Sequence, residues 1–346
     1  CRLIQAGAAR PPSPLYGTSD NRFFAELAPP VTRPTPMALP AVQLKESDRH
    51  FLGVERSLTG RPWRDRLDVR GSALALAIAQ RHGLDELLGR VLAGRNVEVD
   101  NVEAFLDPTI KRLLPDPHTL TDMHIASARI ADAVIGGANT AIFGDYDVDG
   151  ATASALLCRY LRLCGLDPIV HIPDRIFEGY GPNVEAIRSF ADRGVGLLIT
   201  VDCGVTSIEP LAEARKLGLD TIVIDHHQAD ERLPDAVAIV DPNRADDLSG
   251  LGHLAAVGLA FITLVAVTRE LRRRNFWGVT RPEPDLLSLL HLVALGTVAD
   301  VVPLHGLNRA FVAKGLIALK RREHAGTTAL MDAARLAGPP EPWHLG

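Results

Sequence analysis

From residue 139 onward, short apolar runs alternate with longer segments that have the periodicity of amphipathic helices. Continuous apolar runs separated by helices are typical of strands in a parallel sheet, because crossover helices cover both of its faces. The predicted strands are 140–143, 168–172, 197–201, 221–224 and 236–240. The sequence therefore predicts an α/β fold with a doubly wound, mainly parallel sheet of five strands.

Apolar residues spaced three to four apart predict helices around and before this sheet. A small helical unit over 73–105 comes first, with Leu74, Ala77 and Ile78 on one face of its first helix. The other predicted helices are 121–136, 151–164, 183–193, 207–217, 252–275, 285–297 and 308–322. We expect an N-terminal helical region at 49–135, a main domain at 136–325, and the start of a linker at 326–346.

The two ends of the sequence suggest a fragment of a longer protein. The first residue is Cys1, residues 10–40 are rich in proline without apolar periodicity, and Met37 is a candidate start. Such a composition cannot bury a core, so we expect residues 1–48 to be a disordered or non-native extension. The last stretch runs out in Gly338-Pro339-Pro340, without a closing element.

The composition favours a globular protein over a disordered, membrane-spanning or disulfide-rich one. Hydrophobic residues make up 47% of the 346 residues, which is enough for two domains with cores. No apolar stretch approaches the roughly 18 residues of a membrane span, so no membrane partner is expected. The four cysteines form no CxxC pair, and a reducing cytoplasm is the expected compartment. The net charge of −5 argues only weakly against a nucleic-acid partner, because clustered metal-binding carboxylates bias the count.

Acidic and histidine residues follow three of the predicted strands. The segments are GDYDVDG at 144–150, VDCG at 201–204 and DHH at 225–227. Ligands of open parallel sheets bind at the carboxyl ends of the strands, so these side chains are expected at one edge. If the first strand stays extended, alternation places Asp145, Asp147 and Asp149 on the same side.

So many carboxylates repel one another unless cations neutralise them. Asp oxygens mixed with His nitrogens suit Mn²⁺, Zn²⁺ or iron better than Ca²⁺. The number of ligands exceeds the need of one ion, and two ions about 3.5–4 Å apart serve in-line attack of water on a phosphodiester. Each motif alone is commonly a solvated turn or a structural residue, whereas the combination indicates a two-metal site.

Other chemistries have little support. The sequence contains no GxxxxGK[ST] loop and no GxGxxG after a strand, which disfavours nucleoside-triphosphate and NAD chemistry. It also has no GxSxG elbow for a serine nucleophile.

The segment PDRIFEGYGPN at 173–183 precedes a predicted helix and is a candidate phosphate site. Its glycines and proline expose main-chain N–H groups at the helix start, Arg175 can grip a phosphate, and Tyr180 can stack on a base. The plainer interpretation is a tight turn with a surface Arg175 and a packed Tyr180. Ser249 to His253 also open a predicted helix, either as a second anion site or as a helix cap.

These motifs resemble those of the DHH phosphoesterase family, whose name comes from the Asp225-His226-His227 triplet. The segment ALGTVADVVPL at 294–304 resembles a fourth motif of the family. PDRIFEGYGPN, SGLGHLAAVG at 249–258 and LNRAFVAKGL at 307–316 are most similar to its single-strand-specific DNA exonucleases. The resemblance covers about residues 50–345, so that 136–325 would be the DHH catalytic domain.

The resemblance implies a 5′-to-3′ exonuclease that degrades single-stranded DNA to 5′-mononucleotides in DNA repair and recombination, with a helicase or a single-strand-binding protein as possible partners. It implies two Mn²⁺ or Mg²⁺ ions, with Asp202 as their bridge. The metal ligands would be Asp147, Asp149, Asp202, His226 and Asp300. The catalytic residues would be Asp145, Asp225 and His227, of which His227 would contact the scissile phosphate. The substrate-binding residues would be Arg175, Tyr180, Gly181 and His253.

The sequence departs from the family pattern at three positions. Phe143 stands where many relatives carry His, which implies one metal ligand fewer. His291 stands where Asp is common, and Asp241 where Asn is usual. The further substrate-binding and DNA-binding domains of such exonucleases are not visible in this sequence.

Two alternatives remain open. The first is a DHH phosphodiesterase that acts on short oligonucleotides, cyclic dinucleotides or pyrophosphate. The second is a non-catalytic module of a replication assembly, although such relatives have eroded metal motifs, whereas all the motif residues are intact here.

Overall fold

The computed structural model describes residues 50–346, and the chain divides into two compact units, 1–65 and 66–346. The predicted extension over 1–48, with Met37, lies outside the described residues. Of the first unit, 50–65 carry a 3-10 turn, η1 (Phe51–Gly53); the Phe51 N–H donates to the Trp63 carbonyl, and the Trp63 N–H to the Val54 carbonyl. The predicted domain boundaries at 135 and 325 remain predictions.

The second unit is built on a sheet of five parallel strands in the order β2-β1-β3-β4-β5. The strands are β1 (Thr140–Gly144), β2 (Ile169–His171), β3 (Leu197–Val201), β4 (Asp220–Ile224) and β5 (Ala238–Val240). Each lies within two residues of its predicted bounds. The predicted fold class is confirmed.

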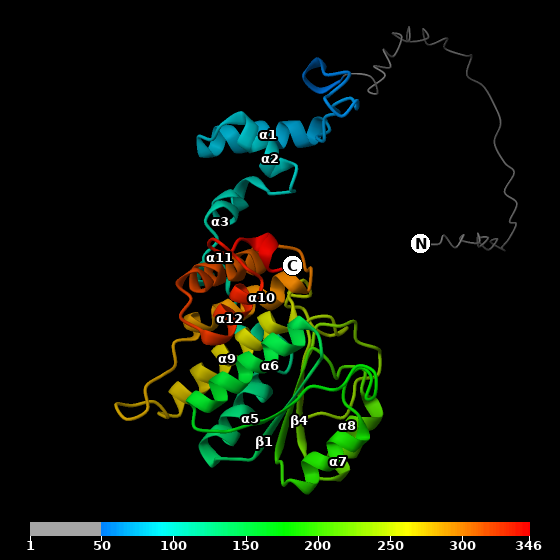
Figure 1. The fold of residues 1–346 in the computed structure, drawn as a ribbon, viewed down its shortest axis with the longest axis vertical. Helices are drawn as coiled ribbons and strands as arrows, with labels where there is room; N and C mark the ends of the chain where they lie inside the picture. The colour runs from blue at the N-terminus through cyan, green and yellow to red at the C-terminus, as the bar shows by residue number, and fades with distance from the viewer. Residues whose placement is uncertain (1–49) are drawn as a thin grey trace, which may run out of the picture. The chain divides into compact units, whose positions relative to one another are not determined.

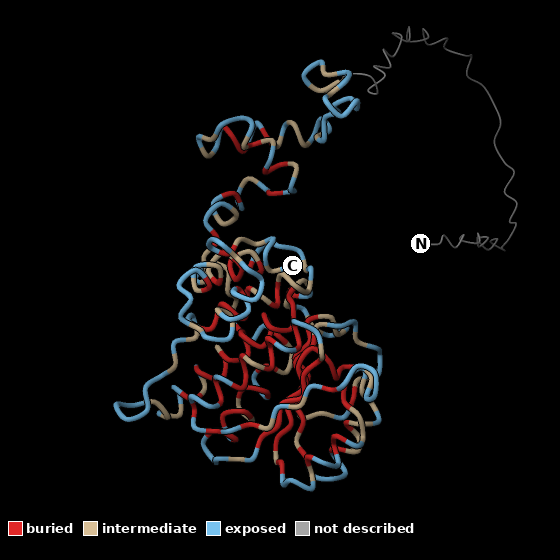
Figure 2. The backbone as a smooth tube through the Cα atoms, in the orientation of Figure 1, coloured by how far each residue is buried: buried red, intermediate tan, exposed pale blue. Residues whose placement is uncertain are grey.

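Helices cover both faces of this sheet (Figure 1). α5 (Met123–Gly136), α6 (Val148–Leu163) and α9 (Ala256–Arg273) pack on one face, and α7 (Val184–Asp192) and α8 (Ile208–Lys216) on the other. Side chains alternate along β1 and so pack on both faces of the sheet. Ile142 packs in the core under α5, α6 and α9, whereas Ala141 and Phe143 pack in the core under α7 and α8. In Figure 2 the strands other than β2 are almost continuously buried, whereas β2, at the edge of the sheet, is partly exposed.

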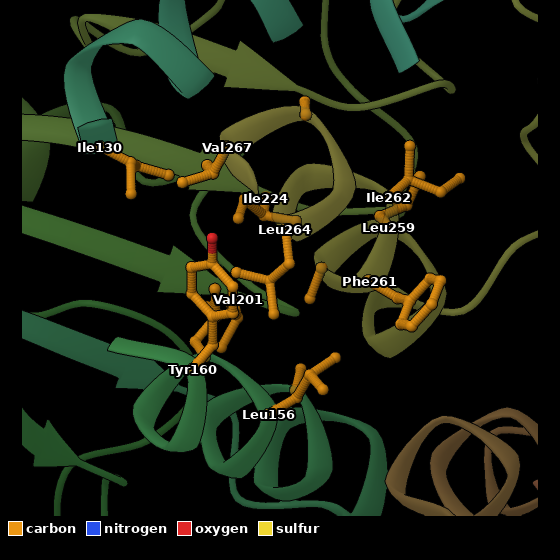
Figure 3. Close-up of a cluster of buried hydrophobic side chains, with 14 of the residues drawn as sticks. Ile130, Leu156, Tyr160, Val201, Ile224, Leu259, Phe261, Ile262, Leu264 and Val267 are labelled. Atoms are coloured by element: carbon orange, nitrogen blue, oxygen red, sulfur yellow. The ribbon is translucent and has the colours of Figure 1, made fainter. Parts of the chain in front are cut away.

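The larger core lies between the sheet and α5, α6 and α9 (Figure 3). Ile130, Leu156 and Leu264 come from these three helices, and Val201 and Ile224 from the strands that they cover. All of them are buried. Burial of apolar surface stabilises the folded state by about 25 cal/mol for each Å² removed from water. This packing fixes the carboxyl ends of β1, β3 and β4, where the acidic motifs lie.

Short helices precede the sheet, as predicted. Those between residues 69 and 106 have a core of their own around Ile78 and Leu92, whereas Ile110 and Leu113 pack against the larger core. The short helices are α1 (Val69–His82), α2 (Glu86–Ala93), η2 (Val99–Asn101), α3 (Val102–Leu106), α4 (Ile110–Leu113) and η3 (Pro117–Thr119). Asp68 and Asp85 start α1 and α2 by accepting main-chain hydrogen bonds.

The helices after α9 are η4 (Leu286–Leu289), α10 (Leu290–Ala299), α11 (Gly306–Arg321), α12 (Ala325–Ala333) and η5 (Pro342–His344). α10 packs against α6, α9 and α11 and ends directly before Asp300. No helix among residues 50–346 is long and apolar enough to cross a membrane.

Candidate metal centre

The three acidic motifs meet at one edge of the sheet because their strands are neighbours in register. Gly144 pairs with Val201, and Val201 pairs with Ile224, so that the next residues, Asp145, Asp202 and Asp225, continue the same rows. The Asp145 N–H donates to the Val201 carbonyl at 3.2 Å, and the Asp202 N–H to the Ile224 carbonyl at 3.0 Å. The predicted meeting of the motifs at this edge is confirmed.

The expected alternation of Asp145, Asp147 and Asp149 is wrong, because the extended conformation ends at Gly144. Asp147 caps α6, and its Oδ1 accepts a hydrogen bond from the Gly150 N–H at 2.9 Å. A Cβ on Gly150 would lie within 2.7 Å of the Asp145 main chain, so the helix can start this close to the strand only with glycine here. Asp145 and Asp147 consequently face Asp202, and Asp149 turns to another part of the site.

Asp149 is held by the first turn of α9. Its Oδ2 accepts from the Ala256 N–H at 2.6 Å, and its Oδ1 from the Val257 N–H at 2.9 Å. Burial nevertheless raises the pKa of Asp149 to about 6. The predicted helix over 252–275 begins at Ala256 instead, and its N–H groups already bind Asp149. A second anion site at the start of this helix is therefore not supported.

Asp202 occupies a strained and unsatisfied position. Its φ is +60°, which is unusual for a residue with a side chain, and only 1% of its surface is exposed. Both carboxylate oxygens are buried without a hydrogen-bond donor. Burial and the neighbouring carboxylates of Asp149 and Asp147 raise its pKa to about 8.

His226 lies among three of the acids. Its Nδ1 is 3.0 Å from the Leu254 carbonyl, and its Nε2 is 3.2 Å from Asp202 Oδ1 and 4.0 Å from Asp149 Oδ2. Asp300, at the end of α10, places Oδ2 3.8 Å from His226 Nδ1. Burial alone would lower the pKa of His226, but these carboxylates, Asp202 first, raise it to about 9.

Asp225 organises the histidine pair instead of facing the other acids. Its Oδ1 accepts from the N–H groups of His226 (2.8 Å) and His227 (3.2 Å) and lies 2.7 Å from His227 Nδ1, while its Oδ2 accepts from the Val205 N–H. Burial acts to raise the pKa of Asp225, but these hydrogen bonds lower it below its usual value. Asp225 is therefore a carboxylate, and it directs Nε2 of His227 outward.

Among residues 50–346, three overlapping groups place their ligand atoms within 4.8 Å of one another. They are Asp145, Asp147 and Asp202; Asp149, His226 and Asp300; and Asp202, His226 and His227. Oxygens of Asp145, Asp202 and Asp300 are buried without a donor, which is costly unless a cation binds them. The mixed oxygen and nitrogen set therefore fits divalent ions such as Mn²⁺ or Mg²⁺. Asp202 and His226 each belong to two groups.

The predicted substrate residues lie at the rim of this centre, with one exception. The guanidinium of Arg175, an exposed residue, lies 5.0 Å from the ring centre of Tyr146, and the Tyr180 hydroxyl reaches the main chain of Asp202. Gly181 has a φ of +76°, which suits glycine in the turn before α7. His253 belongs to none of the ligand groups and packs against the ring of His305 at 4.7 Å.

Sequence reasoning gave Tyr146 no role, although it lies between two candidate ligands. Its ring also contacts Tyr180 edge-on, with 6.5 Å between ring centres. The usable signal was an aromatic residue inside the acidic motif, beside a predicted phosphate site.

The three departures from the family pattern lie in buried surroundings. Phe143 packs in one core cluster with Phe190 of α7. His291 stacks on His324 with 3.7 Å between ring centres. Asp241, directly after β5, is fully buried; its Oδ1 accepts from the Asn243 N–H and its Oδ2 has no donor. Burial raises the pKa of Asp241 to about 7.

Known proteins resemble this chain over the same region. The family model described as "DHH family, N-terminal domain" matches residues 139–297, which end three residues before Asp300. RecJ, a single-stranded-DNA-specific exonuclease, is 39% identical over 223 residues in Bacillus subtilis, covering 64% of this chain and 26% of that protein. RecJ of Salmonella typhimurium is 37% identical over 252 residues, covering 72% and 43%.

Solved RecJ structures share the fold. One, bound to manganese, is 33% identical with a TM-score of 0.57, and covers 67% of this chain and 55% of that one. RecJ of Thermus thermophilus with Mn²⁺ has a TM-score of 0.63 at 28% identity, covering 79% and 37%. The chain thus spans less than half the length of the curated relatives that it matches. Its motifs, its sheet and these similarities agree: residues 139–297 match the DHH family, and RecJ exonucleases are among the relatives of this chain.

Proposed function

We propose that this chain is the catalytic core of a metal-dependent exonuclease that hydrolyses single-stranded DNA in the 5′-to-3′ direction to 5′-mononucleotides, in DNA repair and recombination. The observation that carries the proposal is the set of three overlapping ligand groups, which share Asp202 and His226. RecJ relatives, named as single-stranded-DNA-specific exonucleases, support the substrate, and RecJ structures with Mn²⁺ or Mg²⁺ support the metal.

Two ions fit the ligand groups. We propose that Asp145, Asp147 and Asp202 would hold one, and that Asp149, His226 and Asp300 would hold the other. Asp202 would serve the second ion as well, because its Oδ1 lies 3.2 Å from His226 Nε2. When bound, the ions would supply Lewis-acid activation of water and of the scissile phosphodiester. Asp149 would be kept in place for this purpose by the first N–H groups of α9.

The remaining residues act on the substrate. Asp225 holds His227 by Nδ1 and raises the pKa of the ring, so that the protonated imidazole can donate a hydrogen bond from Nε2 to the charge that develops on the phosphate. Arg175, exposed at the rim, would grip a backbone phosphate through its planar guanidinium. The three described cysteines, Cys158, Cys164 and Cys203, are free and buried, which suits the reducing cytoplasm that we propose as the compartment. A helicase or a single-strand-binding protein remains a predicted partner.

The test is Mn²⁺-dependent hydrolysis, with metal content measured on the same sample. The substrates are single-stranded DNA labelled at either end, duplex DNA, a cyclic dinucleotide and pyrophosphate. Release of mononucleotides from 5′ ends of single strands, lost in Asp202→Ala, is expected. Asp220→Ala is the matched control, because Asp220 begins β4 at the opposite edge of the sheet and pairs with Arg129. Preference for a small substrate, or bound metal without hydrolysis, would contradict the proposal.

A further inference from the structure

The Tyr180 hydroxyl touches two separate parts of the metal centre. It donates a hydrogen bond to the main-chain carbonyl of Asp202 at 3.1 Å, and it lies 3.2 Å from Nδ1 of His227. A phenol is protonated at neutral pH, so its hydroxyl can donate to this carbonyl. The phenol oxygen also acts as an acceptor, because it can share the Nδ1 proton that His227 gives to Asp225.

The main chain of Asp202 is strained and depends on contacts that hold it in place. The φ of this residue is +60°, and no main-chain N–H group holds its buried carboxylate. A strained residue keeps its conformation only where the surroundings fix it. The Asp202 N–H is fixed by the Ile224 carbonyl, and the Tyr180 hydroxyl fixes the carbonyl of the same residue.

The ring of Tyr180 extends from this anchor to the substrate side. It meets the ring of Tyr146 edge-on at 6.5 Å, and the Arg175 guanidinium lies 5.0 Å from the centre of the Tyr146 ring. Overall, 46% of Tyr180 is exposed, although its hydroxyl end faces the centre. The side chain thus joins the residues that would meet DNA to those that would hold metal.

We propose that Tyr180 is a positioning residue, whose hydroxyl sets the Asp202 bridge and the His227 ring relative to each other. This inference rests on the proposed function and assigns to Tyr180 a role other than stacking on a base. Removing the hydroxyl leaves the ring and its contacts with Tyr146 in place, but releases the Asp202 carbonyl and one side of His227. Metal affinity and turnover fall, whereas DNA binding through the rim is kept.

The test compares Tyr180→Phe with Tyr160→Phe. Tyr160 is the matched control, because its hydroxyl also makes a buried hydrogen bond, to Thr268 at 2.7 Å, but in the core between α6 and α9. Mn²⁺ affinity is measured by calorimetry, kcat and KM on 5′-labelled single-stranded DNA, and stability by urea unfolding. Tyr180→Phe is expected to bind Mn²⁺ about 10-fold more weakly and to lose about 10-fold in kcat, with KM changed less than about twofold. Tyr160→Phe is expected to lose stability alone.

The outcomes separate this inference from the proposed function. Wild-type affinity and kcat in Tyr180→Phe, on an otherwise active enzyme, would overturn the positioning role and leave the exonuclease intact. A rise in KM alone would show that Tyr180 serves DNA binding, which also overturns it. If the wild type binds Mn²⁺ but cleaves nothing, the proposed function fails, and a weaker affinity of Tyr180→Phe still supports the positioning of Asp202. No Mn²⁺ binding by the wild type overturns both.

Discussion

The Asp149 carboxylate accepts a hydrogen bond from the Ala256 N–H at 2.6 Å, and so ties the first turn of α6 to the first turn of α9. Its other oxygen accepts from Val257. The first N–H groups of a helix have no partner within the helix and carry its positive end, so a carboxylate satisfies both needs. Asp149 is thus a structural residue as well as a candidate ligand.

Asp149→Asn is therefore expected to destabilise the metal-free protein. Asparagine has one acceptor oxygen and would turn its NH₂ group towards one of the two N–H donors. The expected loss is about 1–3 kcal/mol in the free energy of unfolding, measured by urea denaturation in the presence of a chelator. Stability equal to the wild type would contradict this role for Asp149.

The same change at Asp202 is expected to act in the opposite direction. No main-chain N–H group donates to the Asp202 carboxylate, and the nearby acids repel it. Its folded pKa of about 8 exceeds the unfolded 3.8, so ionisation favours unfolding increasingly as the pH rises from about 4 to about 8. Asp202→Asn should raise metal-free stability at pH 8 by about 1–2 kcal/mol, partly offset by weaker pairing with His226, and should abolish Mn²⁺-dependent hydrolysis. A less stable variant at pH 8 would argue against repulsion at this position.

Metal affinity is expected to depend steeply on pH. The Asp202 carboxylate raises the pKa of His226 in the metal-free protein to about 9, so this pair holds at least one proton at neutral pH and must release it to bind a cation. Apparent Mn²⁺ affinity should rise by about tenfold or more per pH unit between pH 6.5 and 8. Calorimetry in buffers of different ionisation enthalpy would count the released protons. An affinity that does not change with pH would show that neither side chain is a ligand.

Asp241→Asn tests a departure from the family pattern. The folded pKa of Asp241, about 7, lies above the unfolded 3.8, so the wild type loses stability as the pH rises from about 4 to about 7. The asparagine variant avoids this loss, and should be more stable by about 2 kcal/mol at pH 8 and by much less at pH 4. Thermal unfolding of the metal-free protein at both pH values gives the comparison, with exposed Asp192→Asn as the control. A gain that is the same at both pH values would exclude ionisation as its cause.

Local pattern was sufficient to predict the sheet, because a strand buried on both faces is a continuous apolar run. It also placed Asp145, Asp202 and Asp225 together, since neighbouring parallel strands end at one edge. Alternation failed after Gly144 because Gly150 lets α6 begin against the Asp145 main chain, a packing contact that periodicity cannot reveal.

The sequence also could not predict contacts between segments that are far apart along the chain. The bond between Asp149 and Ala256 joins residues 107 positions apart, and the helix that provides the N–H group was expected to begin earlier, at 252. Tyr180 had two interpretations, stacking on a base or packing in a tight turn, and neither predicted that its hydroxyl would contact the main chain of Asp202. Neither contact leaves a local signature in the sequence.

The strand order has a consequence for the synthesis of the protein. The candidate ligands come from β1, β3, β4 and the end of α10, so the sequence from residue 145 to residue 300 must be in place before all of them can meet. The ribosome makes the acidic motif after β1 early, and about 150 residues must follow before Asp300 is synthesised. A nascent chain can therefore capture its full complement of metal only after α10 has left the exit tunnel. Until then it would carry a partly built cluster of carboxylates, whose mutual repulsion works against early closure of the sheet.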